Sequence, residues 1–271
     1  MKEKKLFVRM PINMDYFLPA VAFVHNYVLQ LRTQVGIGMK PKVEPIVIEL
    51  WREDQYFFSP LFPRMELTMG DENRKLSRSE WACVVDLRTV DRALAVAQPV
   101  GKHITDAWGI MFGASPSPLP ELGYMVMYGS REKTWDILVE AELTDSFKLL
   151  KYIEMNYPEA RAGVCKLDTL RCSKLMDTVS STKLLIARRS AATYLATMLK
   201  VGLVEYYPDD LPRTFLSQPP REDYRVVFGD CTAESIWPSL ETVWETSSGM
   251  KYQGVPIIEQ LPFTAEIVLG K

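Results

Sequence analysis

The sequence has few histidines and no paired cysteines, and these shortages exclude some kinds of site. Its 271 residues include 2 histidines and 4 cysteines, and no two cysteines stand in C-x-x-C spacing. Structural zinc sites use Cys and His side chains at such spacings, so we expect no zinc centre. We interpret four residues as buried free thiols, namely Cys83, Cys165, Cys172 and Cys231.

Long apolar runs and a strong net charge are absent too. No stretch approaches the ~20 apolar residues that a membrane-spanning helix needs, and the short apolar run after the charged start is too brief for a secretory signal. We therefore expect a cytoplasmic protein with no membrane span. The net charge of −2 gives no overall attraction to nucleic acid or to an anionic membrane, although a local basic groove is compatible with it.

Several common motifs of nucleotide and hydrolase chemistry are missing. The sequence contains no G-x-G-x-x-G, no G-x-x-x-x-G-K-[ST] and no G-x-S-x-G. It therefore predicts neither the usual dinucleotide fingerprint, nor a P-loop, nor a nucleophile elbow. It also contains no D-x-D triplet of the kind that holds a divalent cation on a diphosphate. We expect no metal and no cofactor.

Short apolar segments with β-branched residues alternate with segments of helical periodicity, which predicts an α/β protein with parallel sheets. Strands are expected at 5–10, 47–51, 82–87, 124–128, 161–167, 183–187, 203–206 and 225–228. Helices are expected at 18–31, 91–96, 104–112, 143–155, 171–179, 191–199 and 235–246. Three prolines interrupt residues 115–122, and we place the domain boundary there. The prediction is two doubly wound, Rossmann-like domains, 1–118 and 123–271, which face each other across a cleft.

Ligands of doubly wound sheets bind at the carboxyl ends of the strands, so the loops that follow the strands are the candidate sites. The first such loop, residues 9–19, places Asp15 near a strand end and a helix start, with Arg9 and Asn13 on the way. Asp15 is placed either to act as a general base or to cap the helix.

Two loops of the second half carry candidates for binding phosphate. Residues 129–135 hold Gly129, Arg131 and Lys133, which suit a diphosphate or a solvated charged turn equally. The loop at 188–192 is more specific, because two arginines precede small residues at a helix start. Its candidates are Arg188, Arg189, Ser190 and Ala191. Such a helix start favours anions, and the alternative is an ordinary N-cap with solvated arginines.

Aromatic side chains follow the next expected strand. Tyr206 and Tyr207 precede a Pro-Asp-Asp segment, and their rings are candidates for holding a nucleobase or a sugar. A plain β-turn explains the Pro-Asp-Asp segment equally well.

Taken in order, these loops resemble the family 9 glycosyltransferases, whose best-known members are the heptosyltransferases of lipopolysaccharide assembly. Arg9 and Asp15 match the R-x(5)-D loop of that family, and Gly129, Lys133 and Trp135 resemble its glycine loop and K-x-W element. The family signature D-[ST]-G-x-x-H-L-A is similar to RSAATYLA at 189–196, and G-P-T-D-P to YPDDLP at 207–212.

The signature departs from the family at three positions. Arg189 stands where the family has Asp, Ala191 where it has Gly, and Tyr194 where it has His. These changes alter the charge and size of the part of the site that recognises the sugar, so we expect a donor other than ADP-heptose.

The resemblance implies a two-domain GT-B fold, a nucleotide-sugar donor held mainly by the second half, and an inverting transfer that needs no metal. Asp15 would deprotonate the acceptor hydroxyl, Lys133 would contact the donor phosphates, and Ser190 and Ala191 would bind the same diphosphate. The acceptor would be a carbohydrate, a glycolipid or a modified nucleic acid. Two alternatives stay open: a phage-type transferase that acts on a hydroxymethylated base in DNA, and a non-catalytic GT-B-like binding module.

Overall fold

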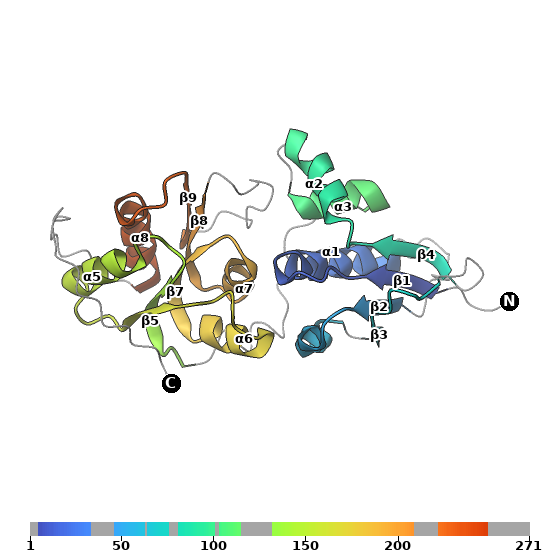
Figure 1. The fold of residues 1–271 in the computed structure, drawn as a ribbon, viewed down its shortest axis with the longest axis horizontal. Helices are drawn as coiled ribbons and strands as arrows, with labels where there is room; N and C mark the ends of the chain where they lie inside the picture. The colour runs from blue at the N-terminus through green and yellow to red at the C-terminus, as the bar shows by residue number, and fades with distance from the viewer. Residues whose placement is uncertain are drawn as a thin grey trace.

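The computed structural model describes residues 5–33, 46–62, 64–75, 81–100, 103–114, 132–208 and 222–248, which form two α/β halves (Figure 1). Each half is built around one parallel sheet, so the predicted class is confirmed. The expected domain boundary at 115–122, the expected strand at 124–128, Gly129 and Arg131 lie outside the described residues. None of the described helices has the length and apolar character to cross a membrane.

The N-terminal half contains a four-stranded sheet in the order β3-β2-β1-β4. Its elements are β1 (Lys5–Arg9), α1 (Met14–Thr33), β2 (Ile46–Leu50), η2 (Glu53–Leu61), β3 (Glu66–Met69), β4 (Trp81–Asp86), α2 (Val90–Ala97), η3 (Gln98–Val100) and α3 (Ile104–Phe112). β3 and the 3-10 helix η2 were not expected from the sequence. In the case of β3, the strand is short and half exposed. α1 begins at Met14 and not at residue 18 as expected, so Asp15 lies inside the helix.

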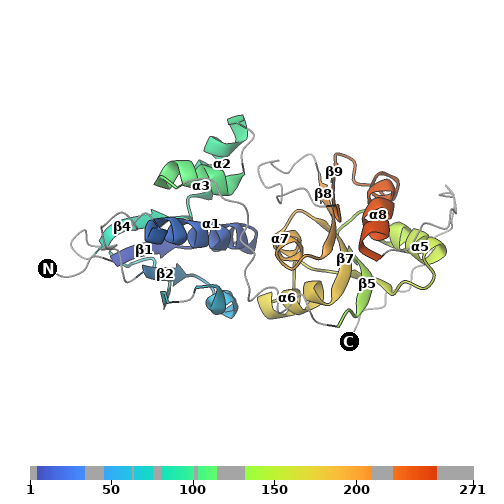
Figure 2. The same cartoon turned by 180° about the vertical axis from the view of Figure 1, so that it is seen from behind.

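The C-terminal half contains a five-stranded sheet in the order β6-β5-β7-β8-β9. Its elements are β5 (Trp135–Glu140), α5 (Ser146–Asn156), β6 (Ala162–Cys165), α6 (Cys172–Ser180), β7 (Thr182–Arg188), α7 (Ala191–Met198), β8 (Gly202–Tyr207), β9 (Tyr224–Phe228) and α8 (Ala233–Ser248). Figures 1 and 2 show α6 and α7 on the side that faces the N-terminal half, and α5 and α8 on the far side. The chain order of strands and helices is therefore doubly wound, as predicted.

The strands of the C-terminal sheet are apolar on both faces because helices cover both. Ile137 and Val139 of β5 belong to the core under α5 and α8, whereas Leu138 between them belongs to the core under α6 and α7. This second core also contains buried side chains of α1, α3 and η2. The apolar interior is thus continuous between the two halves on the side where they meet.

Candidate functional site

A cavity of about 340 Å³ opens where the two halves meet, at the carboxyl ends of β5 and β7. The N-terminal half contributes Asn13, Met14, Asp15, Arg52 and Asp54 to its wall. The C-terminal half contributes side chains from the loops after β5, β6 and β7 and from the start of α7. Carboxyl strand ends are where doubly wound sheets bind ligands, so this cavity is the candidate site.

Asp15 lies in the first turn of α1 and lines the cavity. Its own helix is capped by Asn13, whose Oδ1 accepts the Asp15 amide hydrogen at 2.9 Å. Asp15 Oδ1 instead accepts the amide hydrogen of Ala191 at 2.7 Å. The carboxylate therefore caps α7 in the other half while it lines the cavity.

The start of α7 has the small residues that were predicted for an anion site. Ser190 Oγ accepts the Ala192 amide hydrogen at 3.3 Å, and Thr193 Oγ1 accepts the Ser190 amide hydrogen at 3.2 Å. Together with the bond from Asp15, these contacts satisfy the first amides of the helix. A negatively charged group at this end is stabilised by the helix dipole.

Arg189 lines the cavity but is held by its neighbours. Its guanidinium lies 3.7 Å from the centre of the Tyr194 ring and 3.6 Å from a carboxylate oxygen of Glu205. It also donates to Ser190 O at 2.9 Å and to Thr193 Oγ1 at 3.0 Å. Arg189 therefore supplies buried positive charge beneath α7, whereas the half-buried Arg188 lies in the cavity wall itself.

Tyr194 stands where the family signature has His, and it joins the two halves. Its hydroxyl is hydrogen-bonded to Nε2 of His103, the N-cap residue of α3. Burial, with a further contribution from Arg189, lowers the pKa of His103 to about 3. The ring is therefore neutral at physiological pH and acts as a structural tie between α3 and α7.

Tyr206 and Tyr207, predicted to hold a base or a sugar, are both buried in the sheet. Strand β8 extends through Tyr207, so the two rings point to opposite faces of the sheet and are 3% and 1% exposed. Neither belongs to the cavity wall. The Tyr206 hydroxyl reaches Glu140, and the Tyr207 ring packs in the core under α7.

Lys133, predicted to contact the donor phosphates, does not line this cavity. Lys133 precedes β5, and its Nζ donates to the carbonyl of Ser180 at 2.7 Å, just before β7 begins. Trp135 pairs with Thr182 at the amino ends of these strands, whereas Ser190 follows the carboxyl end of β7. Lys133 and Ser190 therefore lie at opposite edges of the sheet. Lys133 and Trp135 of the K-x-W element thus lie at the amino end of β5.

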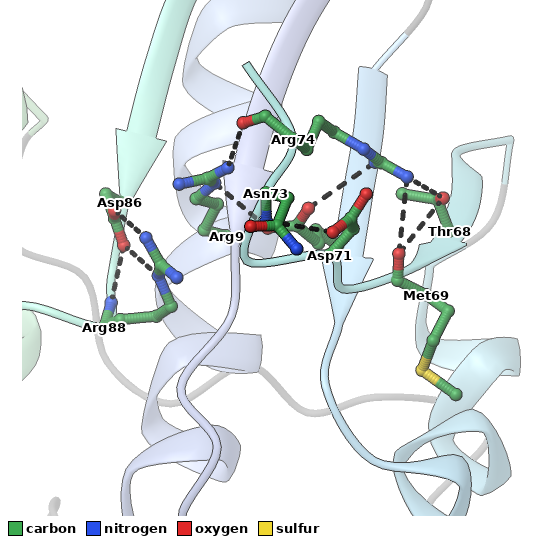
Figure 3. A network of polar contacts seen from close by, with 9 residues as sticks. Arg9, Thr68, Met69, Asp71, Asn73, Arg74, Asp86 and Arg88 are labelled. Atoms are coloured by element: carbon green, nitrogen blue, oxygen red, sulfur yellow. Dashed lines mark hydrogen bonds and ion pairs between the residues drawn. The ribbon is translucent and has the colours of Figure 1, made fainter. Parts of the chain in front are cut away.

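Arg9 is neutralised within the N-terminal sheet and does not line the cavity. Its Nε lies 3.0 Å from the carboxylate of Glu49, which is fully buried and also pairs with Arg74 at 3.5 Å. Burial raises the pKa of Glu49, and Arg9 and Arg74 oppose that shift. Figure 3 shows this network at the carboxyl ends of the strands, beside the pair formed by Asp86 and Arg88.

Glu140, the last residue of β5, was not among the residues predicted from the sequence. This side chain lines the cavity although it is only 2% exposed. Its Oε2 accepts the amide hydrogen of Arg188 at 2.5 Å and the hydroxyl hydrogen of Tyr206 at 3.0 Å. Burial raises the pKa of Glu140 to about 7. An acidic residue at the end of the mainly apolar run 135–140 was the available signal, but no strand was predicted there and Trp135 was assigned to a loop.

Other acidic groups surround the same cavity. Glu142 and Asp168 both line it, and burial together with the hydrogen bond to Asp168 raises the pKa of Glu142. Among the residues that the structure describes, no group of three or more His, Cys, Asp or Glu side chains is arranged to hold a metal ion.

No protein-family model matches this sequence, and no curated protein does either. Solved structures do match it. The heptosyltransferase WaaC of E. coli, solved with ADP, is 11% identical with a TM-score of 0.54, and the match covers 91% of this chain and 100% of WaaC. A family 9 glycosyltransferase from Veillonella parvula DSM 2008 is 13% identical with a TM-score of 0.54, and the match covers 91% of this chain and 99% of that one.

The glycosyltransferase TibC from enterotoxigenic E. coli H10407 is 10% identical with a TM-score of 0.50, and the match covers 80% of this chain. This chain spans only 61% of the length of TibC. At such low identities the likeness establishes the architecture. This chain therefore has the two-sheet α/β architecture of the GT-B glycosyltransferases.

Proposed function

We propose that this chain is a metal-independent, inverting glycosyltransferase that moves a sugar from a nucleotide-sugar donor to an acceptor hydroxyl. The observation that carries the proposal is the position of Asp15. Its carboxylate reaches across the cavity from the N-terminal half to the first amide of α7 in the C-terminal half. A base on one side and a helix start on the other is the arrangement that displacement of a diphosphate requires.

In the proposed reaction, the diphosphate of the donor binds at the Ala191 amide and beside Arg188. Because Asp15 holds that amide in the present structure, donor binding exchanges the carboxylate for a phosphate oxygen and releases Asp15. Asp15 then accepts the proton of the acceptor hydroxyl, whose oxygen attacks the anomeric carbon. The bond from that carbon to the phosphate oxygen breaks, and the α7 amides and Arg188 stabilise the charge that develops on the leaving diphosphate.

A second candidate is a non-catalytic binding module with the same fold, and the charge of the cavity favours it. The wall contains 5 carboxyl groups and 3 guanidinium groups. Arg52 pairs with Asp54 at 2.6 Å, and Arg189 pairs with Glu205 at 3.6 Å. Because carboxyl groups outnumber guanidinium groups, this wall suits a neutral polyol better than a diphosphate. A diphosphate fits the cavity only where Arg188 and the amides of α7 hold its phosphates.

Transfer and hydrolysis assays with UDP-, GDP-, ADP-, CMP- and dTDP-sugars separate the two candidates. The proposal predicts turnover by the wild type and a loss of at least 100-fold in Asp15→Asn, because general base catalysis contributes about 10²–10⁴-fold. Asp106→Asn is the control, since Asp106 lies in the first turn of α3 and does not line the cavity. Binding without turnover assigns the module, and unchanged turnover in Asp15→Asn removes Asp15 from the role of base.

A further inference from the structure

Gln55, in the first turn of η2, is a fully buried amide whose side chain has a partner at each hydrogen-bonding position. Its Oε1 accepts the amide hydrogens of Trp51 at 2.9 Å and of Arg52 at 3.3 Å. Its Nε2 donates to the carbonyl oxygens of Pro11 at 2.8 Å and of Ile12 at 3.3 Å. A side-chain amide accepts through its oxygen and donates through its nitrogen, so these partners fix the orientation of the group.

The two sides of this amide have different partners in the chain. The bond from Arg52 belongs to a capping box at the start of η2 and is local to that turn. The bonds to Pro11 and Ile12 join residues that are 44 and 43 positions apart, and they end in the loop between β1 and α1. The capping box does not require them. The nitrogen of Gln55 therefore fixes a second segment, the loop 10–13.

This loop leads directly to Asp15. Asn13 follows Ile12 in the chain, and its Oδ1 accepts the Asp15 amide hydrogen at 2.9 Å. Asp15 in turn accepts the Ala191 amide hydrogen at 2.7 Å. The place of the Asp15 carboxylate thus depends on where Gln55 holds the loop. A general base works only within about 2.6–3.2 Å of the atom whose proton it accepts, so this placement matters for the chemistry.

The turn that carries Gln55 is itself held against the C-terminal half. Asp54 precedes Gln55, and its Oδ2 accepts the thiol hydrogen of Cys172 at 3.3 Å, at the start of α6. Asp54 and Cys172 line the same cavity as Asp15. Gln55 therefore joins two segments of the N-terminal half that each contact the C-terminal half in the cavity wall.

We propose that Gln55 is a positioning residue that sets the place of the Asp15 carboxylate opposite the start of α7. The inference rests on the proposed function, because the role of Asp15 as the base comes from it. Gln55 is not part of the cavity wall, so it acts on the reaction through the loop 10–13 and not by touching the ligand.

A double-mutant cycle with Gln55→Met and Asp15→Asn tests the inference. The measurement is the hydrolysis of UDP-glucose, GDP-mannose, ADP-glucose and dTDP-glucose. We expect Gln55→Met to lower kcat about tenfold or more, because misplacing a reacting group by about 1 Å costs about 10²-fold. In the Asp15→Asn background the same change should lower kcat by less than about twofold, because the group that it misplaces is already absent.

A general structural role predicts the same loss in both backgrounds, and that result overturns the inference. Unchanged kcat in Gln55→Met overturns it too. If Gln55→Met does not fold, Gln55→Glu takes its place in the cycle, because Glu keeps the acceptor of the capping box and has at most one hydrogen to donate to the loop. The same confinement of the loss to the Asp15 background is then expected.

Asn156→Leu is the matched control. This buried amide donates to the Tyr152 carbonyl at 2.8 Å within α5, on the side of the C-terminal half that lies away from the cavity (Figure 1). The control measures what the loss of a buried amide costs in general, and we expect its kcat to match that of the wild type. A loss equal to that of Gln55→Met contradicts a specific role for Gln55.

Calorimetric titration with UDP and GDP separates this inference from the proposed function. If Gln55 holds Asp15 on the Ala191 amide, Gln55→Met weakens that competitor, and a diphosphate should bind about twofold more tightly than in the wild type. The gain should vanish in the Asp15→Ala background. This pattern in a chain that hydrolyses no nucleotide sugar supports the positioning role and refutes the transferase. A chain that neither binds these nucleotides nor hydrolyses the sugars refutes both.

Discussion

Asp15 and the first amide of α7 share one hydrogen bond of 2.7 Å, although the two residues are 176 positions apart in the sequence. The carboxylate occupies the position proposed for a phosphate oxygen of the donor. Asp15→Ala removes this competitor, and we expect nucleoside diphosphates to bind about fivefold more tightly, because a helix cap is worth about 1 kcal/mol. Titration of the variant with UDP, GDP and ADP measures the change. Unchanged affinity, or the same gain in Asp106→Ala, contradicts the competition.

Glu140 also makes the stability of the fold depend on pH. Its pKa is raised to about 7 by burial, and in the unfolded chain it returns to the ordinary value of about 4.3. The folded state then binds more protons than the unfolded state between these values, so stability falls as the pH rises through that window. Each pH unit costs at most about 1.4 kcal/mol. Urea unfolding at pH 5, 6 and 7 should show the decline in the wild type and a shallower one in Glu140→Gln. Equal slopes would falsify the shifted pKa.

The strand β8 carries a buried ion pair under α7. Glu205 is fully buried, pairs with Arg189 at 3.6 Å and accepts the Tyr224 hydroxyl hydrogen at 2.7 Å. Arg189→Met removes the guanidinium group of this buried ion pair, and we expect a loss of about 3–5 kcal/mol. Adding Glu205→Gln to that variant should restore part of the loss, because no charge then remains buried. Chemical denaturation measures both, and a double variant that is less stable than Arg189→Met contradicts this role.

How much of the site the sequence could predict depends on where β5 begins and ends in the chain. The rule that ligands bind after strand ends placed Asp15, Ser190 and Ala191 together, and the structure brings them to one cavity. It grouped Lys133 with them, because the apolar pattern predicted a strand at 124–128 and none at 135–140, where β5 lies. When a strand lies further along the chain than expected, a residue predicted to follow its carboxyl end lies before its amino end, at the opposite edge of the sheet.

Other features depended on contacts between distant residues. The sequence shows apolar periodicity but not which strand neighbours which, so the meeting of Glu140 with Arg188 and Tyr206 had no local signal. For the same reason the bond between Asp15 and α7 could not be distinguished from an ordinary cap of α1. The class of fold could be predicted because apolar residues repeat every 3.6 residues in helices and every 2 residues in strands, and these patterns are local.

Both halves share one apolar interior, and polar contacts between the halves accompany it. Buried side chains of α1, α3 and η2 belong to the same core as those of α6 and α7. Asp15 binds the Ala191 amide, and Tyr194 binds His103. A large apolar interface makes independent domain motion unfavourable. We therefore expect the halves to unfold together, in one calorimetric transition whose van't Hoff and calorimetric enthalpies agree. Two separate transitions in the wild type contradict this coupling.

The most direct measurement is a crystal structure with the nucleoside diphosphate that stabilises the chain most in a thermal-shift screen of UDP, GDP, ADP and dTDP. A ligand at about 100 times its dissociation constant adds about 2.7 kcal/mol of stability, so the best nucleotide is identifiable. We predict a phosphate oxygen within hydrogen-bond distance of the Ala191 amide, with Asp15 released into the cavity. A diphosphate bound elsewhere, with the bond from Asp15 to Ala191 intact, would contradict the account.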